Sequence, residues 1–165
     1  MASLQQKLTY ELIDAQKACQ SAEYIVDVAY SLADDPRVLL RAMDSAGRAA
    51  VLAIAILLKV DHFQRKVSLG TSPELTRAMF FSQCALSHGL SEEDCKALRH
   101  LILLRETYQQ SGFEFSVDSK AVIMNDALET FALDVEQAQK LVVVVKIVID
   151  KARLAISSLS TTAID

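Results

Sequence analysis

The amino-acid sequence predicts a mainly α-helical protein, an antiparallel bundle of about five helices with a small β-hairpin before the last helix. Residues 49–58 form an unbroken apolar run, AAVLAIAILL. At about 1.5 Å per residue this run is roughly half as long as a bilayer's hydrocarbon core is thick, so we expect a helix buried on every side within protein. Only 4 Gly and 2 Pro occur, which favours long helices with few breaks.

The chain of 165 residues fits a single domain, with a polar tail from about residue 157. A formal net charge of −4 lacks the basic excess typical of nucleic-acid-binding proteins. The N-terminus has no basic segment followed by an apolar core, and no run approaches the length of a membrane span. We therefore expect a soluble cytoplasmic protein with no membrane association and no cofactor.

Two long helices are expected first, over residues 3–32 and 35–66. Asp34, Asp35 and Pro36 separate them, with Asp35 as N-cap and Pro36 as the first residue of the second helix. Each helix carries small and apolar residues at alternating spacings of four and three, which places them in one seam per helix. The seams predict that the two helices pack as an antiparallel hairpin along these residues: Leu8, Leu12, Ala15, Cys19, Ala22, Val26 and Ala29, and Leu39, Met43, Ala46, Ala50, Ala53, Leu57 and Val60.

The middle of the chain predicts a loop over residues 68–71 and two further helices. Ser72 and Pro73 begin the first of these helices, and Gly89 ends it as a left-handed residue. Ser91 is the expected N-cap of the next helix, because Glu92, Glu93 and Asp94 follow it at the positive end of the helix dipole. That helix is expected to end near residues 111–112.

Beyond residue 112 the apolar period changes from helical to alternating, and residues 113–132 predict a hairpin of two or three strands. Asp134, with Gln137 in the capping-box position, then begins the last helix. The run LVVVVKIVI is rich in β-branched residues and is also compatible with a buried strand. A sustained seam decides for a helix: Ala138, Leu141, Val145, Val148, Ala152, Ala155 and Leu159.

Arg105 stands on the apolar face of the helix that follows Ser91, where a leucine would be expected. A buried guanidinium needs a carboxylate, carbonyl groups or solvent. One interpretation is that Arg105 extends to solvent, Glu114 or Glu129. The other is a functional arginine in a groove, with Tyr108 and Ser111 beside it.

The second long helix also carries a basic stripe opposite its seam: Arg37, Arg41, Arg48, Lys59 and Lys66. Such a stripe fits phosphate or an acidic partner. Asp44 interrupts it, however, and Leu52, Ala55 and Ile56 flank it with apolar surface. We therefore favour a solvated face that passes into a contact with a second copy of the chain.

Three other site types are weighed against structural roles. Cys84, His88, Cys95 and His100 match no zinc-module spacing, so no metal site is expected, and the cysteines are interpreted as small buried residues. The sequence contains no nucleophile elbow, phosphate-binding loop or dinucleotide fingerprint. An apolar cavity lined by Phe113, Phe115 and Tyr108 is a further possibility, although these aromatics more simply fill one end of the core.

The order of elements and the segments DPRVLLRAMDSAGRAA and KALRHLILLRETYQQSGFEF resemble small archaeal helical-bundle proteins related to the HEPN superfamily, over residues 35–154. The resemblance implies a helical fold and a dimer. Active HEPN members are metal-independent ribonucleases that use an Arg followed, after a short polar spacer, by a His. Here Arg105 is followed by ETYQQSG without a His, and His100 precedes it, so the general base of such a ribonuclease is missing.

Two functional hypotheses follow. The first is a non-catalytic helical interaction module that self-associates as a homo-oligomer or binds a protein partner. The alternative is a HEPN-like RNA-binding or ribonuclease-type protein that uses Arg105 and the basic stripe.

Overall fold

The computed structural model describes residues 2–110 and 113–160 and confirms a mainly α fold with five helices and a small antiparallel sheet before the last helix. Two of the helices contain a π-helical turn, η1 and η2. The elements in order are α1 (Leu4–Tyr24), η1 (Ile25–Ala29), α2 (Tyr30–Ala33), α3 (Val38–Phe63), α4 (Pro73–Met79), η2 (Phe80–Cys84), α5 (Glu92–Gln110), β1 (Phe113–Val117), β2 (Lys120–Met124), β3 (Thr130–Leu133) and α6 (Val135–Ser158).

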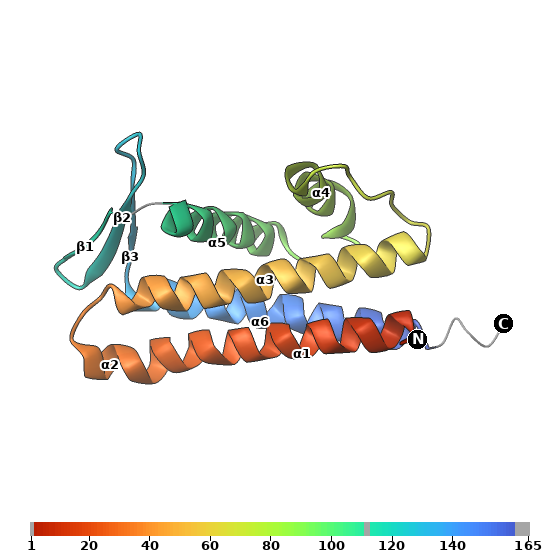
Figure 1. Cartoon of the computed structure of the whole chain (residues 1–165), viewed down its shortest axis with the longest axis horizontal. Coiled ribbons are helices and arrows are strands. Elements are labelled where there is room, and N and C mark those ends of the chain that lie inside the picture. The colour runs from red at the N-terminus through yellow and green to blue at the C-terminus, as the bar shows by residue number, and fades with distance from the viewer. Residues whose placement is uncertain (1, 111–112, 161–165) are drawn as a thin grey trace.

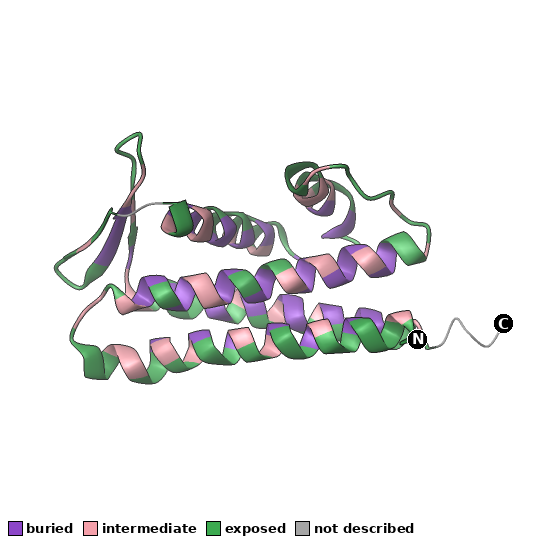
Figure 2. Ribbon diagram, in the orientation of Figure 1, coloured by how far each residue is buried: buried purple, intermediate pink, exposed green. Residues whose placement is uncertain are grey.

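Helix α3 lies between two layers of the molecule (Figure 1). On one side it packs against α1 and α6, the other two long helices, which also contact each other. On its other side lie α5 and the η2 turn that follows α4, and the sheet stands at one end of the bundle (Figure 1). Buried residues follow α3 along both sides, as Figure 2 shows.

The first long helix spans the predicted range, with α1, η1 and α2 continuous. Ser3 caps it in a capping box with Gln6, and Asp34 ends it in the left-handed conformation (φ 51°). Six of the seven predicted seam residues are buried, and the seventh, Ala29, is half-buried. The η1 turn contains the last fully buried residue of the seam, Val26.

The predicted bounds of the second long helix were wrong at both ends. Helix α3 begins at Val38 because the backbone of Asp35 and Pro36 forms tight i→i+3 turns, in which the carbonyl of Asp35 accepts from Val38. The Asp35 carboxylate still accepts the amide of Arg37. The helix ends at Phe63, and Arg65 is left-handed (φ 58°). All seven predicted seam residues are buried.

The apolar run at residues 49–58 is helical, but it is not buried on every side as predicted. Val51 is 37% exposed, and Leu52 and Ala55 are half-buried. These residues face away from α1, where α4 and α5 cover the run only in part. The uncovered part becomes the floor of the groove described below.

The predicted N-caps of α4 and α5 are confirmed, and the Ser72 hydroxyl accepts the amide of Leu75. Gly89 has the predicted positive φ of 78°, but the helix that begins at Pro73 ends at Cys84, and residues 85–89 form turns. At the start of α5, the Ser91 hydroxyl accepts the amide of Asp94, and the Asp94 carboxylate accepts the amide of Ser91.

The sheet has three antiparallel strands in the order β1-β2-β3, with Phe115 opposite Val122 and Ile123 opposite Phe131. Asp134 and Gln137 form the predicted capping box, and the LVVVVKIVI segment is helical. The seam of α6 is buried except for the half-buried Leu159. Helix α6 continues through Ser158, past the predicted start of the polar tail, and residues 161–165 of that tail lie outside the described residues.

Within residues 2–110 and 113–160, no helix has the length and apolar character needed to cross a membrane.

Candidate functional site

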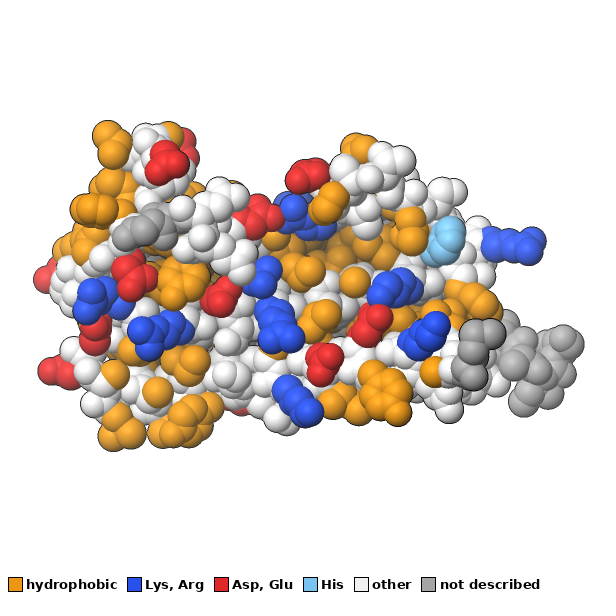
Figure 3. Space-filling view, in the orientation of Figure 1, with side chains coloured by type: hydrophobic (Ala, Val, Ile, Leu, Met, Phe, Trp, Pro, Cys, Tyr) orange, Lys and Arg blue, Asp and Glu red, His pale blue; other side chains and the backbone are white. Residues whose placement is uncertain are grey.

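An apolar groove of about 490 Å³ lies between α3, the segment before α4, and α5. This volume falls within the range of small-molecule and side-chain pockets. Figure 3 shows it as an orange hollow between α4 and α5, with blue and red side chains at its edge. The groove is lined by Val51, Ile54, Ala55, Leu58, Gly70, Thr71, Ser72, Pro73, Thr76, Arg77, Ile102, Arg105 and Glu106.

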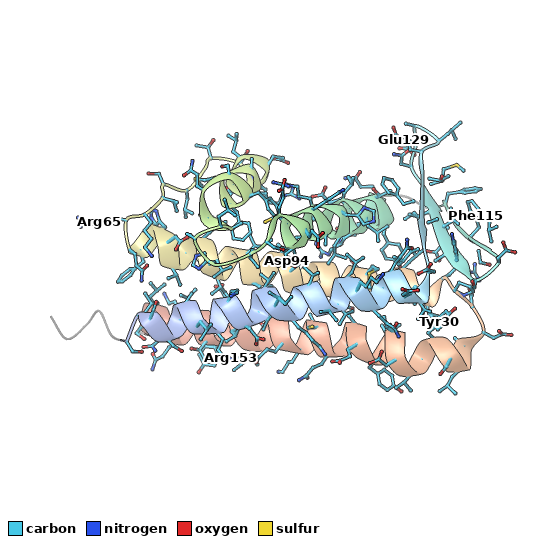
Figure 4. All side chains as sticks on the ribbon, turned by 180° about the vertical axis from the view of Figure 1, so that it is seen from behind. Tyr30, Arg65, Asp94, Phe115, Glu129 and Arg153 are labelled. Atoms are coloured by element: carbon cyan, nitrogen blue, oxygen red, sulfur yellow. The ribbon has the colours of Figure 1, made fainter. Side chains whose placement is uncertain are left out.

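Arg105 lies at the wall of this groove, where α5 packs against α3. Its Nε is 3.3 Å from Oδ1 of Asp44 on α3, and its side chain is 23% exposed. Its stem fills the space beside Gly47, where an added Cβ would lie 2.6 Å from Cδ of Arg105. The carboxylate that pairs with Arg105 is therefore Asp44, not Glu114 or Glu129; Glu129 lies at the far tip of the sheet (Figure 4).

Of the two residues predicted to accompany Arg105, the one that the structure describes, Tyr108, does not line the groove. Tyr108 is half-buried and packs against the core, and Ser111 lies outside the described residues. Phe113, Phe115 and Tyr108, the residues considered for an apolar cavity, do not line the groove. Phe113 and Phe115 stack edge to face on the sheet, and Phe113 is mostly exposed.

Two cation contacts tie α4 and η2 to α5 at the edge of the groove. Arg77 forms an ion pair with Glu106, and the Arg99 guanidinium lies 4.5 Å from the centre of the Phe81 ring. These pairs were not identified from the sequence, because each joins residues on different helices. They close one side of the groove and leave its floor on α3 open.

The basic stripe is divided among three environments. Arg37 pairs with Asp35 at 2.8 Å and lowers the pKa of that carboxyl, and Lys59 pairs with Glu11 of α1 at 2.7 Å. Lys66 follows the end of α3. Arg41 and Arg48 are exposed and pair with no carboxylate of the described residues.

A buried polar cluster joins the end of α3 to the segment after α4. The Asp61 carboxylate is 1% exposed, and its Oδ2 lies 2.9 Å from Nε2 of His88. Because a carboxylate only accepts, Nε2 carries the proton of this hydrogen bond. Cys84 lies beside the pair; burial and then the Asp61 carboxylate raise the pKa of its thiol to about 11.

This cluster explains two of the residues considered above for metal binding. His88 holds Asp61, Cys84 is buried and Cys95 is also buried. Within the described ranges, no three His, Cys, Asp or Glu side chains are arranged to hold a metal ion. Asp61 was not considered in the sequence analysis, because its partner His88 lies 27 residues further along the chain.

The outer face of α1, on the side away from its buried seam, is also apolar. Tyr10, Ile13, Tyr24, Val28 and Leu32 are all exposed, Leu32 by 78%. We call these five residues the outer stripe. Hydrophobic side chains gather toward both ends of the lower edge in Figure 3, with a blue side chain between them. The spacing was visible in the sequence but was not considered there, because the inner seam alone accounts for a bundle helix.

The groove is suited to binding apolar groups and poorly suited to acid-base catalysis. Glu106 is its one carboxylate among the lining residues, and it is paired with Arg77. None of the lining residues is a His or a Cys, and the hydroxyls of Ser72 and Thr76 are engaged in hydrogen bonds at the start of α4. No known protein-family model and no curated protein matches the sequence.

Proposed function

We propose that the chain is a non-catalytic helical interaction module that self-associates. The observation that carries the proposal is that α1 is apolar on two opposite sides. Its inner side is buried against α3 and α6, and its outer stripe is exposed. A surface helix normally has one apolar face, so the two exposed apolar groups of the outer stripe, Tyr10 with Ile13 and Tyr24 with Val28 and Leu32, support a contact with another molecule.

A second copy of this chain is the partner that the charges favour. The exposed charges of α1 and η1 include both signs, with Lys7 and Lys17 as well as Asp14 and Asp27. A surface of mixed charge can pair with itself, whereas an acidic or basic partner would favour one sign. The composition of the groove, with no acid-base pair, supports a binding role over a catalytic one.

RNA binding is the competing function, and Arg41 and Arg48 are the residues that it would use. Asp44 lies between them in the sequence. Of the other residues of the basic stripe, Arg37 and Lys59 are engaged in ion pairs. Contact with phosphates is strengthened by the release of counterions, so RNA binding would be strongly salt-dependent.

Sedimentation velocity of the whole chain from about 1 to 100 μM tests the proposal, because this range covers the affinities of weak to moderate homodimers. We expect the sedimentation coefficient to rise with concentration toward that of a dimer. A monomer at every concentration would contradict self-association. A salt-dependent shift of labelled RNA that is lost in Arg41→Glu would instead favour the RNA-binding function.

A further inference from the structure

The floor of the groove is an apolar strip along α3. It consists of Val51, Ile54, Ala55 and Leu58, which lie on one side of the helix and span about 10 Å along its axis. Ile102 of α5 extends the same apolar surface. Figure 3 shows this surface in the hollow between α4 and α5. An apolar body as long as a medium-length acyl chain would cover the strip and remove it from water.

The charged side chains that line the groove do not balance. Three of the described lining residues are charged: Arg77 and Glu106, which pair with each other, and Arg105. The carboxylate beside Arg105, that of Asp44, is outside the groove lining and 39% exposed, and its Oδ1 also accepts from Nε2 of Gln109. The lining therefore carries one more cation than anions.

The Arg105 guanidinium keeps its donors available. Its Nε is buried and lies 3.3 Å from Oδ1 of Asp44, but the two atoms are not aligned as a hydrogen bond. The guanidinium forms no hydrogen bond with any residue that the structure describes. A guanidinium has five N–H donors in a planar fork, which matches the two oxygens of a carboxylate. A ligand carboxylate would therefore meet a need that the protein itself leaves open.

From the apolar floor and this unmatched guanidinium, we propose that the groove binds a free monocarboxylic acid with an apolar body, of the medium-chain fatty acid type. The apolar body lies along the strip on α3, and the carboxylate accepts hydrogen bonds from Arg105. A phosphate monoester suits the groove less well, because its charge of about −2 at neutral pH would meet one unmatched cation beside Glu106 and Asp44. The volume of about 490 Å³ favours a small molecule over a partner helix.

The site is separate from the surface proposed for self-association. The groove lies on the side of α3 that faces α4 and α5, whereas the outer stripe belongs to α1 on the other side (Figure 1). Ligand binding therefore goes beyond self-association and does not depend on it.

Isothermal titration calorimetry of the whole chain with octanoate and with octanol separates the carboxylate from the apolar body. We expect the wild type to bind octanoate about tenfold more tightly than octanol, because hydrogen bonds between charged groups are the stronger ones. Arg105→Gln should weaken octanoate binding about tenfold and leave octanol binding unchanged. The comparison of the two ligands on the wild type requires no variant to fold.

Two further variants serve as controls for position. Arg99→Gln removes the same charge from α5, but Arg99 does not line the groove, so both affinities should stay unchanged. Ala55→Leu fills part of the groove floor and should weaken octanoate and octanol alike. Thermal melts followed by circular dichroism check that each variant folds.

Three results would overturn the proposal. The first is octanoate that fails to bind at millimolar concentration, and the second is octanoate that binds no more tightly than octanol. The third is an equal loss of octanoate affinity in Arg99→Gln and Arg105→Gln, which would indicate attraction to the general charge of α5. If octanoate does not bind and Ala55→Leu dissociates a wild-type dimer in sedimentation, a second copy covers the groove, and self-association stands while the ligand site is refuted.

Discussion

The two sides of α3 are held to the rest of the molecule by different chemistry. Toward α1 and α6 the contact is made mainly by Ala, Cys, Val and Leu side chains, and the Lys59–Glu11 ion pair lies at its margin. Toward α4, η2 and α5 the contacts include the buried Asp61–His88 pair and the Arg105–Asp44 pair. The first side depends on side-chain size, and the second depends on matched charges.

The difference teaches where this fold tolerates change. Small residues in the seams determine how closely the long helices approach, so a larger side chain there cannot be accommodated without moving the helices apart. On the other side, a buried polar group is stable only while its partner remains. Three experiments test this comparison, in order of decreasing expected effect.

The largest effect is expected from removal of His88. In His88→Ala the Asp61 carboxylate stays buried without a partner, which we expect to lower the free energy of unfolding by about 3–5 kcal/mol. Urea denaturation followed by circular dichroism measures the change. Replacing both members, in the variant Asp61→Leu/His88→Leu, should recover most of the loss, because no unpaired charge remains.

The matched control for this experiment is His100→Ala, which removes an exposed imidazole from α5. Its unfolding free energy should stay within about 0.5 kcal/mol of the wild type. If His88→Ala lowered the unfolding free energy as little as His100→Ala, the contact between α3 and the segment after α4 would not depend on the buried pair.

The seam between α1 and α3 is tested by added volume. Ala50 is fully buried, so Ala50→Leu should force the helices apart and cost about 1–3 kcal/mol of unfolding free energy. Ala55→Leu, five residues along α3 at the floor of the groove, adds the same atoms where space is open. Thermal and urea unfolding should show a clear loss of unfolding free energy in Ala50→Leu and a much smaller change in Ala55→Leu. Equal losses in the two variants would contradict the conclusion that the seam is packed more tightly than the groove.

The smallest effect concerns the Cys84 thiol at alkaline pH. Its pKa is raised from the usual 9.0 to about 11 by burial and by Asp61, so the folded state favours the neutral thiol. The associated stability is present below pH 9 and is lost as the pH rises toward 11, because the unfolded thiol ionises first. Urea midpoints of the wild type and Cys84→Ala should therefore converge over this pH range, and parallel curves would contradict the shift.

Local rules were enough to predict most of the fold. Periodic seams located the long helices, and Ser72, Ser91 and Asp134 marked three helix starts because capping depends on neighbours three residues away. The start of α3 was misplaced because the turn at Asp35 and Pro36 competes with the helix for the same backbone groups.

The candidate site was harder to predict from the sequence because its contacts join distant parts of the chain. Arg105 was correctly noticed as out of place on an apolar face, but its partner Asp44 lies on another helix, and sequence proximity favoured Glu114 and Glu129. His88 and Asp61 were separated in the same way, by the whole segment that forms α4. Such pairs are determined by how helices pack, which periodicity alone does not specify.

The position of α3 between two layers has a consequence for folding. Since α3 supplies a face to each layer, unfolding it would expose apolar surface of both at once. The two layers are therefore expected to melt in a single cooperative transition, with α3 as the shared element that prevents either from persisting alone.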